Sequence, residues 1–276
     1  MISSLAEYSV LAPLQTRIET HRTYSELPDD VEQAVMDAAG LHQGDALLDV
    51  GCGTGSFLTR LRNEGHEGRL VGLDSSTAAL AVLSRADRVE TVLADAMRLP
   101  FADAEFDVVA ARHMLYHAER PLKAIREGSR VLRIGGRFVA TVNDAHTTPH
   151  VVRLVAESAQ ANGFTSPTPP NMRVHSRNLP RLVETAFGNV SAYRHDNALV
   201  FTTPEPLVAY AVALLSFYGV TADAPNRPRV IRTMARTAAS WFASHSTPWR
   251  DPKSYTICVA TRLEEDARPP KTGTLH

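Results

Sequence analysis

Short apolar runs alternate with segments of helical periodicity along the central part of the chain. The segments between the runs place apolar residues three and four positions apart, which is typical of helices packed on one side. The runs read ALLDV, RLVGLD, ETVLAD, FDVVAA and GRFVATVN. Near-continuous apolar strands separated by helices predict an α/β fold whose parallel sheet is covered on both faces. This prediction covers residues 46–142.

The flanking regions predict further elements around this core. A helix is expected over residues 27–40, with acids in its first turn and Gly40 at its end. After the fifth strand we expect helices at 147–163 and 177–187, a strand at 189–201, helices at 203–219 and 228–245, and a last strand at 254–263. Residues 165–171 read as a proline-rich loop, and the polar tail from residue 264 has a composition typical of disorder.

Charge and composition exclude several classes of function. The 276 residues carry a formal net charge of -1, so the basic stripe of a nucleic-acid-binding protein is absent from the sequence. The sequence also lacks an apolar run of membrane-spanning length, a polybasic segment and a signal peptide at its start. Cys52 and Cys258 form neither a disulfide framework nor a metal-binding spacing. We therefore expect a reduced, cytoplasmic protein without a metal, a membrane or a nucleic acid as partner.

A glycine-rich turn follows the first apolar run, in LLDVGCGTGSFLTRL at residues 47–61. Such turns between a strand and a helix commonly hold a nucleotide. A dinucleotide fingerprint G-x-G-x-x-G would need a third glycine where Ser56 stands, because Gly51, Gly53 and Gly55 alternate here. The Gly-Lys-Ser/Thr ending of a phosphate-binding loop is missing as well.

Asp49, two residues before the first glycine, indicates which nucleotide fits. A carboxylate at the end of this strand would repel a pyrophosphate but attract an ammonium or sulfonium group. S-adenosyl-L-methionine has both cations, an adenosine and no phosphate. The sequence therefore predicts a site for this molecule, with S-adenosyl-L-homocysteine as the product of methyl transfer.

At this point the chain resembles the class I, Rossmann-like S-adenosylmethionine-dependent methyltransferases of the bacterial small-molecule type. DVGCGTG is similar to their first motif, and LVGLDSS, VLADAMRLPF, FDVVAARHMLYH and VLRIGGRFVATVN follow in the family's order over residues 45–145. The resemblance implies a doubly wound, mostly parallel seven-stranded sheet with a late antiparallel hairpin. It also implies an N-terminal helical cap at 1–44, a cofactor-binding core at 45–145, helices forming a lid and substrate site with the final strands at 146–262, and a tail at 263–276.

The resemblance also implies roles for the acids at the next two strand ends. Asp74 would accept both ribose hydroxyls, Asp95 would receive the adenine amino group, and the Ala96 amide would face a ring nitrogen. The expected cofactor-binding residues of the core are Asp49, Gly51, Cys52, Gly53, Gly55, Asp74, Ser75, Asp95, Ala96, Met97 and Arg112.

Simpler roles remain open for several of these residues. Asp49 could cap local amides, Asp74 could cap the helix that follows it, and Asp95 could cap a turn. Cys52 is expected to fill a tight space rather than to act as a nucleophile. Arg112 could lie alongside the cofactor through its backbone alone.

The N-terminal stretch RIETHRTYSELPDD resembles a bacterial subgroup of this family whose leading helix covers the cofactor. On that basis Arg17 or Tyr24 is expected near the methionine end of the cofactor.

Histidines follow the fourth and fifth strands, where the reacting methyl group would point in this fold. His113, His117 and His146 are therefore candidates for a general base that takes a proton from the acceptor. The alternative is that they pack under the cofactor or cap a helix. The aromatic residues at 217, 218, 241 and 242 are expected in a core, or otherwise in an apolar substrate pocket.

Together these patterns predict a methyltransferase that acts on a small molecule, as a monomer or homodimer. Oxygen is slightly favoured as the acceptor because two histidines could serve as bases, while nitrogen and carbon remain open. The N-P-P-Y-type motif of nucleic-acid base methyltransferases is absent after the fourth strand, where ARHMLYH stands. Two alternatives are a cofactor-binding regulatory subunit without turnover and a cyclase assisted by the bound sulfonium.

Overall fold

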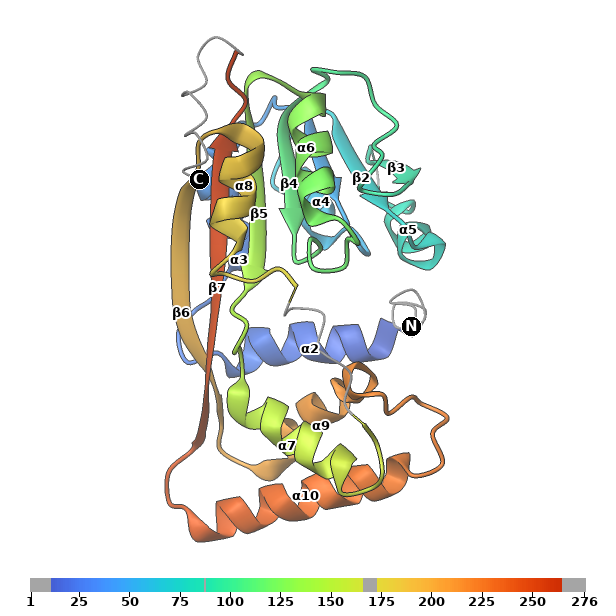
Figure 1. Ribbon diagram of the computed structural model, residues 1–276, viewed down its shortest axis with the longest axis vertical. Coiled ribbons are helices and arrows are strands. Elements are labelled where there is room, and N and C mark those ends of the chain that lie inside the picture. The colour runs from blue at the N-terminus through green and yellow to red at the C-terminus, as the bar shows by residue number, and fades with distance from the viewer. Residues whose placement is uncertain (1–10, 87, 166–172, 265–276) are drawn as a thin grey trace, which may run out of the picture. The chain divides into compact units, whose positions relative to one another are not determined.

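The computed structural model describes residues 11–86, 88–165 and 173–264, and the chain in it forms two compact units (Figure 1). The sheet unit contains residues 31–143, 173–194 and the part from 255 onward. The helical unit contains the part up to residue 30, residues 144–172 and residues 195–254. The expected proline-rich loop and polar tail lie almost entirely outside the described residues.

A seven-stranded sheet in the order β3-β2-β1-β4-β5-β7-β6 forms the core of the sheet unit. β1 pairs in parallel with β2 and β4, β2 with β3, and β4 with β5, whereas β5 and β7 are antiparallel. The strands are β1 (Leu47–Val50), β2 (Leu70–Asp74), β3 (Glu90–Leu93), β4 (Phe106–Arg112), β5 (Leu132–Asn143), β6 (Ser191–Phe201) and β7 (Trp249–Thr261). This order confirms the predicted doubly wound, mostly parallel fold with a late antiparallel strand.

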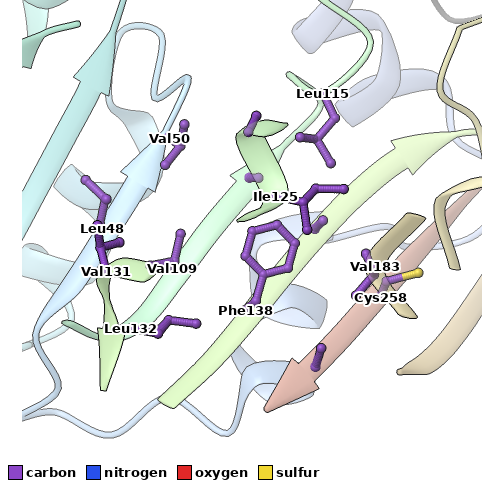
Figure 2. Close-up of a cluster of buried hydrophobic side chains, with 14 of the residues drawn as sticks. Leu48, Val50, Val109, Leu115, Ile125, Val131, Leu132, Phe138, Val183 and Cys258 are labelled. Atoms are coloured by element: carbon purple, nitrogen blue, oxygen red, sulfur yellow. The ribbon is translucent and has the colours of Figure 1, made fainter. Parts of the chain in front are cut away.

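Helices α6 (Pro121–Val131) and α8 (Leu179–Phe187) cover one face of this sheet. Figure 2 shows the apolar cluster beneath them, in which Leu48, Val109 and Phe138 from adjacent strands pack against Ile125 of α6 and Val183 of α8. The Phe138 and Phe187 rings stack 5.3 Å apart. Alternate residues of each strand point to this face, because successive side chains of a strand point to opposite sides.

Helices α3 (Val31–Ala39), α4 (Ser56–Asn63) and α5 (Thr77–Leu83) contribute to a second cluster on the other face. In this cluster Phe57 of α4 and Val35 of α3 pack against Leu47, Val108 and Val139 of the strands. Each of these three strand residues is next in sequence to a residue of the first cluster, so its side chain points to the opposite face. Both faces are therefore covered, as the near-continuous apolar strands predict.

The helical unit is built from α2 (Leu11–Tyr24), α7 (Pro149–Gln160), α9 (Pro204–Val212), the short 3-10 helix η2 (Leu215–Tyr218) and α10 (Arg227–Ser244). Its core joins α7, α9 and α10 through apolar residues that include Leu154, Leu207 and Met234. Tyr218 is buried in this core, and Phe217, Trp241 and Phe242 pack against it, which confirms a packing role for the aromatic residues at 217, 218, 241 and 242.

A buried ion pair also lies inside the helical unit. The Nζ atom of Lys253 donates to Asp29 Oδ2 at 2.6 Å and to Ser25 Oγ at 2.7 Å, and lies 3.4 Å from His21 Nδ1. The side chains of Lys253 and Asp29 are only 7% and 8% exposed. The other ring nitrogen of His21 lies 3.2 Å from the hydroxyl of Tyr210, and burial raises the pKa of Tyr210 to about 12. This network fixes the end of α2 and the segment after it to the first half of β7.

Some element boundaries differ from those expected. α3 packs on the sheet and belongs to the sheet unit, although its residues were expected in the N-terminal cap. α8 likewise belongs to the sheet unit, although it was expected among the lid helices. β7 begins at Trp249, five residues before the apolar run that predicts it, because residues 249–253 alternate in burial and do not form a continuous apolar stretch.

Candidate functional site

The loop between β1 and α4 takes a conformation that favours glycine at three positions. Gly51, Gly53 and Gly55 have φ angles of +70°, +56° and +75°, in the left-handed region that other residues rarely adopt. A Cβ atom on Gly51 would lie 2.6 Å from Met114 Cβ, and one on Gly55 would lie 2.1 Å from Leu83 Cδ1. A Cβ on Gly53 would meet no atom within 4 Å. The loop is therefore packed at its two ends and open at its middle, where a ligand can approach the backbone.

Asp74 joins this loop to the end of β2. Its Oδ2 accepts a hydrogen bond from the Gly53 amide and its Oδ1 from the Ser76 amide, each at 2.9 Å. Ser76, not Asp74, caps α5, by accepting a bond from the Ala79 amide. Because each carboxylate oxygen has two acceptor sites, both oxygens of Asp74 retain capacity for a further hydroxyl donor.

Asp95 lies past the end of β3 and is exposed. Its Oδ1 accepts a hydrogen bond from the Met97 amide at 2.8 Å, so the turn-capping alternative is observed. The Ala94 amide bonds the Asp74 carbonyl at 3.1 Å, which ties the ends of β2 and β3 together. Ala96 and Met97 are half-buried and Ser75 is exposed.

Asp49 is fully buried and forms an ion pair with Arg112 across β1 and β4. Arg112 Nη2 lies 3.0 Å from Asp49 Oδ2, and their side chains are 13% and 1% exposed. Burial raises the pKa of the Asp49 carboxyl, the Arg112 guanidinium opposes the rise, and the negative charge of Asp74 adds to it. The negative charge of Asp49 is thus already paired with Arg112, whereas the sequence suggested a carboxylate whose cationic partner would be the ligand.

Glu32 on α3 lies on the other side of the same guanidinium, a contact that sequence reasoning missed. Its Oε1 lies 3.6 Å from Arg112 Nη1. The same oxygen accepts a hydrogen bond from Ser56 Oγ at 3.0 Å, and its Oε2 lies 3.7 Å from Arg60. Arg112 also stacks over the ring of Phe57, with its Cζ atom 4.2 Å from the ring centroid. The only sequence signal for Glu32 is that it falls in the acidic first turn of a helix.

His113 and His117 follow β4, as expected. His113 has a φ angle of +50°, and its amide donates to the Thr141 carbonyl of β5 at 2.8 Å. His117 is half-buried, with its ring 4.5 Å from the ring of Tyr116. His146 is exposed and belongs to the helical unit, where its amide bonds Asp144 Oδ1 at 3.0 Å. The sheet unit therefore contains two of the three candidate bases.

Cys52 is buried beside Gly72, and a Cβ atom on that glycine would lie 2.9 Å from the Cys52 sulfur. Burial and the nearby charges of Asp49 and Asp74 raise the pKa of the Cys52 thiol. A thiol that resists ionisation is a poor nucleophile, so a space-filling role is the reading that these contacts favour.

Arg17 and Tyr24 are both in the helical unit. The Arg17 guanidinium lies over the Phe217 ring, 4.7 Å from its centroid, and the Tyr24 ring lies 5.2 Å from that of Phe201. Both contacts pack α2 within its own unit, and contact with a cofactor stays a prediction for these two residues.

Comparison with known families finds a match over the central part of the sheet unit. The family model described as "Methyltransferase domain" matches residues 48–140, which run from β1 to the middle of β5 and include the glycine loop, Asp74 and Arg112. Residues 48–140 therefore match a methyltransferase domain. This matched methyltransferase domain accounts for about a third of the chain, and the match confirms the resemblance that the sequence motifs showed.

Curated relatives match the chain over a somewhat longer stretch than the family model does. The chain is 36% identical over 143 residues to the 2-phytyl-1,4-naphtoquinone methyltransferase of Thermosynechococcus vestitus, over 50% of this chain and 63% of that protein. It is 34% identical over 136 residues to the demethylmenaquinone methyltransferase of Staphylococcus saprophyticus, over 48% of this chain and 55% of that protein. The chain thus spans about half the length of the curated relatives it matches.

Solved structures show that the class I fold extends beyond the methyltransferase domain. A methyltransferase from an antibiotic biosynthesis pathway of Anabaena variabilis, described as putative, has a TM-score of 0.62 at 16% identity, over 90% of this chain and all of that chain. The [4+2]-cyclase SpnF has a TM-score of 0.61 at 19% identity, over 94% of this chain and 96% of that chain. At such identities the likeness establishes the fold alone.

Neither a cluster of metal ligands nor a membrane-spanning helix is found among the described residues. Within residues 11–86, 88–165 and 173–264, no three His, Cys, Asp or Glu side chains converge as metal ligands would. No helix in the same part of the chain has the length and apolarity needed to cross a bilayer.

Proposed function

We propose that this chain is an S-adenosyl-L-methionine-dependent methyltransferase that acts on a small molecule. The observation that carries the proposal is the bond between Asp74 and the open middle of the glycine loop, within the matched methyltransferase domain. It places a carboxylate with spare acceptor capacity next to backbone that a nucleoside can approach. When bound, the cofactor supplies an electrophilic methyl group on sulfur.

The residues of the chain fit the parts of this cofactor. Asp74 would accept the ribose hydroxyls, Asp95 would receive the adenine amino group through its second oxygen, and Asp49 would receive a cation. Alignment of acceptor and methyl group would then be the main contribution of the protein, since orientation alone can supply roughly 7–11 kcal/mol of a barrier.

Replacing Asp74 by asparagine exchanges one of its two acceptor oxygens for an NH₂ donor. This should weaken binding of the cofactor about 10- to 100-fold, because a ribose hydroxyl left without its acceptor loses about 1–3 kcal/mol. Calorimetric titration with S-adenosylmethionine and S-adenosylhomocysteine measures this directly. Asp37→Asn is the matched control, since it removes one exposed carboxylate of the sheet unit away from the loop. Equal affinity in Asp74→Asn and wild type would contradict the ribose assignment.

The acceptor is proposed to be a hydroxylated or quinone-type small molecule. Two of the matched relatives are named for quinones, 2-phytyl-1,4-naphtoquinone and demethylmenaquinone, and one at 40% identity over 105 residues is the 27-O-demethylrifamycin SV methyltransferase of Amycolatopsis mediterranei. Carbon and oxygen acceptors should therefore both be screened, with oxygen slightly favoured by the two histidines near β4.

Formation of S-adenosylhomocysteine together with a product 14 Da heavier, the mass of an added CH₂, would establish transfer. A changed acceptor with the cofactor unspent would instead support a cyclase like SpnF, and cofactor binding without any turnover would support a regulatory subunit.

We also propose that His113 or His117 is the general base. Replacing the base should lower kcat about 10²- to 10⁴-fold and leave cofactor affinity unchanged. His113→Asn is the suitable change at that position, because asparagine tolerates a positive φ better than glutamine does. His117→Gln and His146→Gln complete the set, and the pH dependence of kcat should lose its acidic limb only in the base variant. Parallel losses of affinity and turnover in a variant would assign that histidine a structural role.

A further inference from the structure

Arg112 lies between two carboxylates that differ in burial. Asp49, at 3.0 Å, is 1% exposed, whereas Glu32, at 3.6 Å, is 23% exposed. The closer and more buried partner is the one at the end of β1, beside the glycine loop. Stacking on Phe57 places the guanidinium where it reaches both acids.

Glu32 is held in place independently of Arg112. Ser56 Oγ donates to it at 3.0 Å, and Arg60, which also pairs with Glu64 at 2.7 Å, lies 3.7 Å away. Its carboxylate therefore stays beside Arg112 even when the guanidinium shifts. At 3.6 Å from Arg112 Nη1, the Glu32 carboxylate is close enough to act as a second ion-pair partner of the guanidinium.

A cation that pairs with Asp49 must compete with Arg112 for the same carboxylate. Two cations beside one buried carboxylate repel each other. The guanidinium of Arg112 therefore has to move away from Asp49 and pair with another anion. Glu32 is the acid that already contacts its far side. The pairing of Arg112 with Glu32 and the binding of a cation to Asp49 are thus coupled. Because such coupling is reciprocal, each of the two favours the other by the same free energy.

We propose that Glu32 is a positioning residue of the cofactor site. Glu32 becomes the main ion-pair partner of Arg112 when the ammonium group of the cofactor pairs with Asp49. This inference rests on the proposed function, and it adds a residue of α3 to a site otherwise built from the strand ends. Glu32 acts only through Arg112, so it sets affinity for ligands that carry the amino-acid end and not for those that lack it.

The test is Glu32→Gln, titrated calorimetrically with three ligands. S-adenosylmethionine and S-adenosylhomocysteine both carry the ammonium group, whereas 5′-methylthioadenosine shares the nucleoside but lacks the amino-acid end. We expect the Kd of the first two to rise about 5- to 20-fold, within the usual range of coupling between sites, and that of methylthioadenosine to stay within about twofold. Glutamine can still accept the Ser56 hydrogen bond, so the local packing of α3 is preserved.

Two further variants complete the design. Glu32→Asp, which keeps the charge, should restore most of the affinity for S-adenosylmethionine. Glu64→Gln removes the other carboxylate of Arg60 without touching Arg112 and should bind all three ligands as the wild type does.

The possible outcomes separate this inference from the proposed function. Equal losses for all three ligands in Glu32→Gln, or no loss for any, would overturn the role of Glu32 and leave the cofactor site standing. Failure of the wild type to bind any of the three would overturn the proposed function itself.

Discussion

Replacing Arg112 by glutamine should lower the free energy of unfolding of the sheet unit by about 3–5 kcal/mol at neutral pH, since breaking a buried ion pair leaves an uncompensated charge. The side chain of Asp49 is 1% exposed, and Arg112 is the cation that contacts it. Without the guanidinium, the buried carboxylate can avoid its charge only by taking up a proton.

The loss should therefore depend on pH. Burial already raises the pKa of Asp49 in the folded protein, and removal of Arg112 raises it further. A carboxyl group with a raised folded pKa gives its full stability below the unfolded pKa of about 3.9, and that stability is lost as pH rises through the folded pKa. Urea unfolding followed by circular dichroism should accordingly show a smaller gap between variant and wild type at pH 5 than at pH 8.

Two variants test this explanation. Asp49→Asn in the Arg112→Gln background removes the charge that causes the loss and should recover most of the stability, with little remaining pH dependence. Arg133→Gln breaks an ion pair with Asp107 in which Arg133 is 51% exposed, so its effect should stay below about 1 kcal/mol. If Arg112→Gln loses no more than Arg133→Gln, the buried pair does not support the fold as described.

Lys253→Met should have a comparable effect on the helical unit, again about 3–5 kcal/mol, because it leaves Asp29 buried without its cation. Both tryptophans of the chain, Trp241 and Trp249, belong to this unit. Tryptophan fluorescence during urea unfolding therefore follows the helical unit, while circular dichroism follows both units.

Controls for Lys253→Met lie in the same unit. Asp29→Asn should recover much of the loss in the double variant, because the buried charge is then gone. Arg250→Met breaks a pair with Glu26 in which Arg250 is 54% exposed, and it should lower stability far less than Lys253→Met does, because solvent screens an exposed pair. A stable Lys253→Met protein with an unshifted fluorescence transition would show that the network does not anchor α2.

The sheet and the glycine loop were predictable because their signals are local. Apolar runs set the strands, and alternating glycines after Asp49 set a turn whose positive φ angles the structure contains. The resemblance singled out Asp74 and Asp95, and the structure places both after neighbouring parallel strands, whose carboxyl ends lie at one edge of the sheet. Their contacts with a cofactor stay predictions. The turn contact of Asp95 was among the alternatives, whereas the helix-capping alternative for Asp74 is not observed, because Ser76 caps α5.

What the sequence could not provide are contacts between residues far apart in the chain. Asp49 and Arg112 are 63 positions apart, so nothing in DVGCGTG shows that the acid already has a partner. The same holds for the N-terminal motif, in which His21 and Ser25 meet Lys253 more than 200 residues later. Membership of α3 in the sheet unit was missed because an amphipathic helix does not reveal which apolar surface it will cover.

The order of the strands has a consequence for how the chain can fold during synthesis. β6 leaves the ribosome before β7, yet in the sheet it lies outside β7, which alone connects it to β5. Apart from its pairing with residues 25 and 26, β6 therefore has no neighbouring strand in the sheet until translation has passed from Phe201 to Thr261, an interval of several seconds at about 5–20 residues per second. The methyltransferase domain is complete well before then, so its nascent form must present the edge of β5 unpaired.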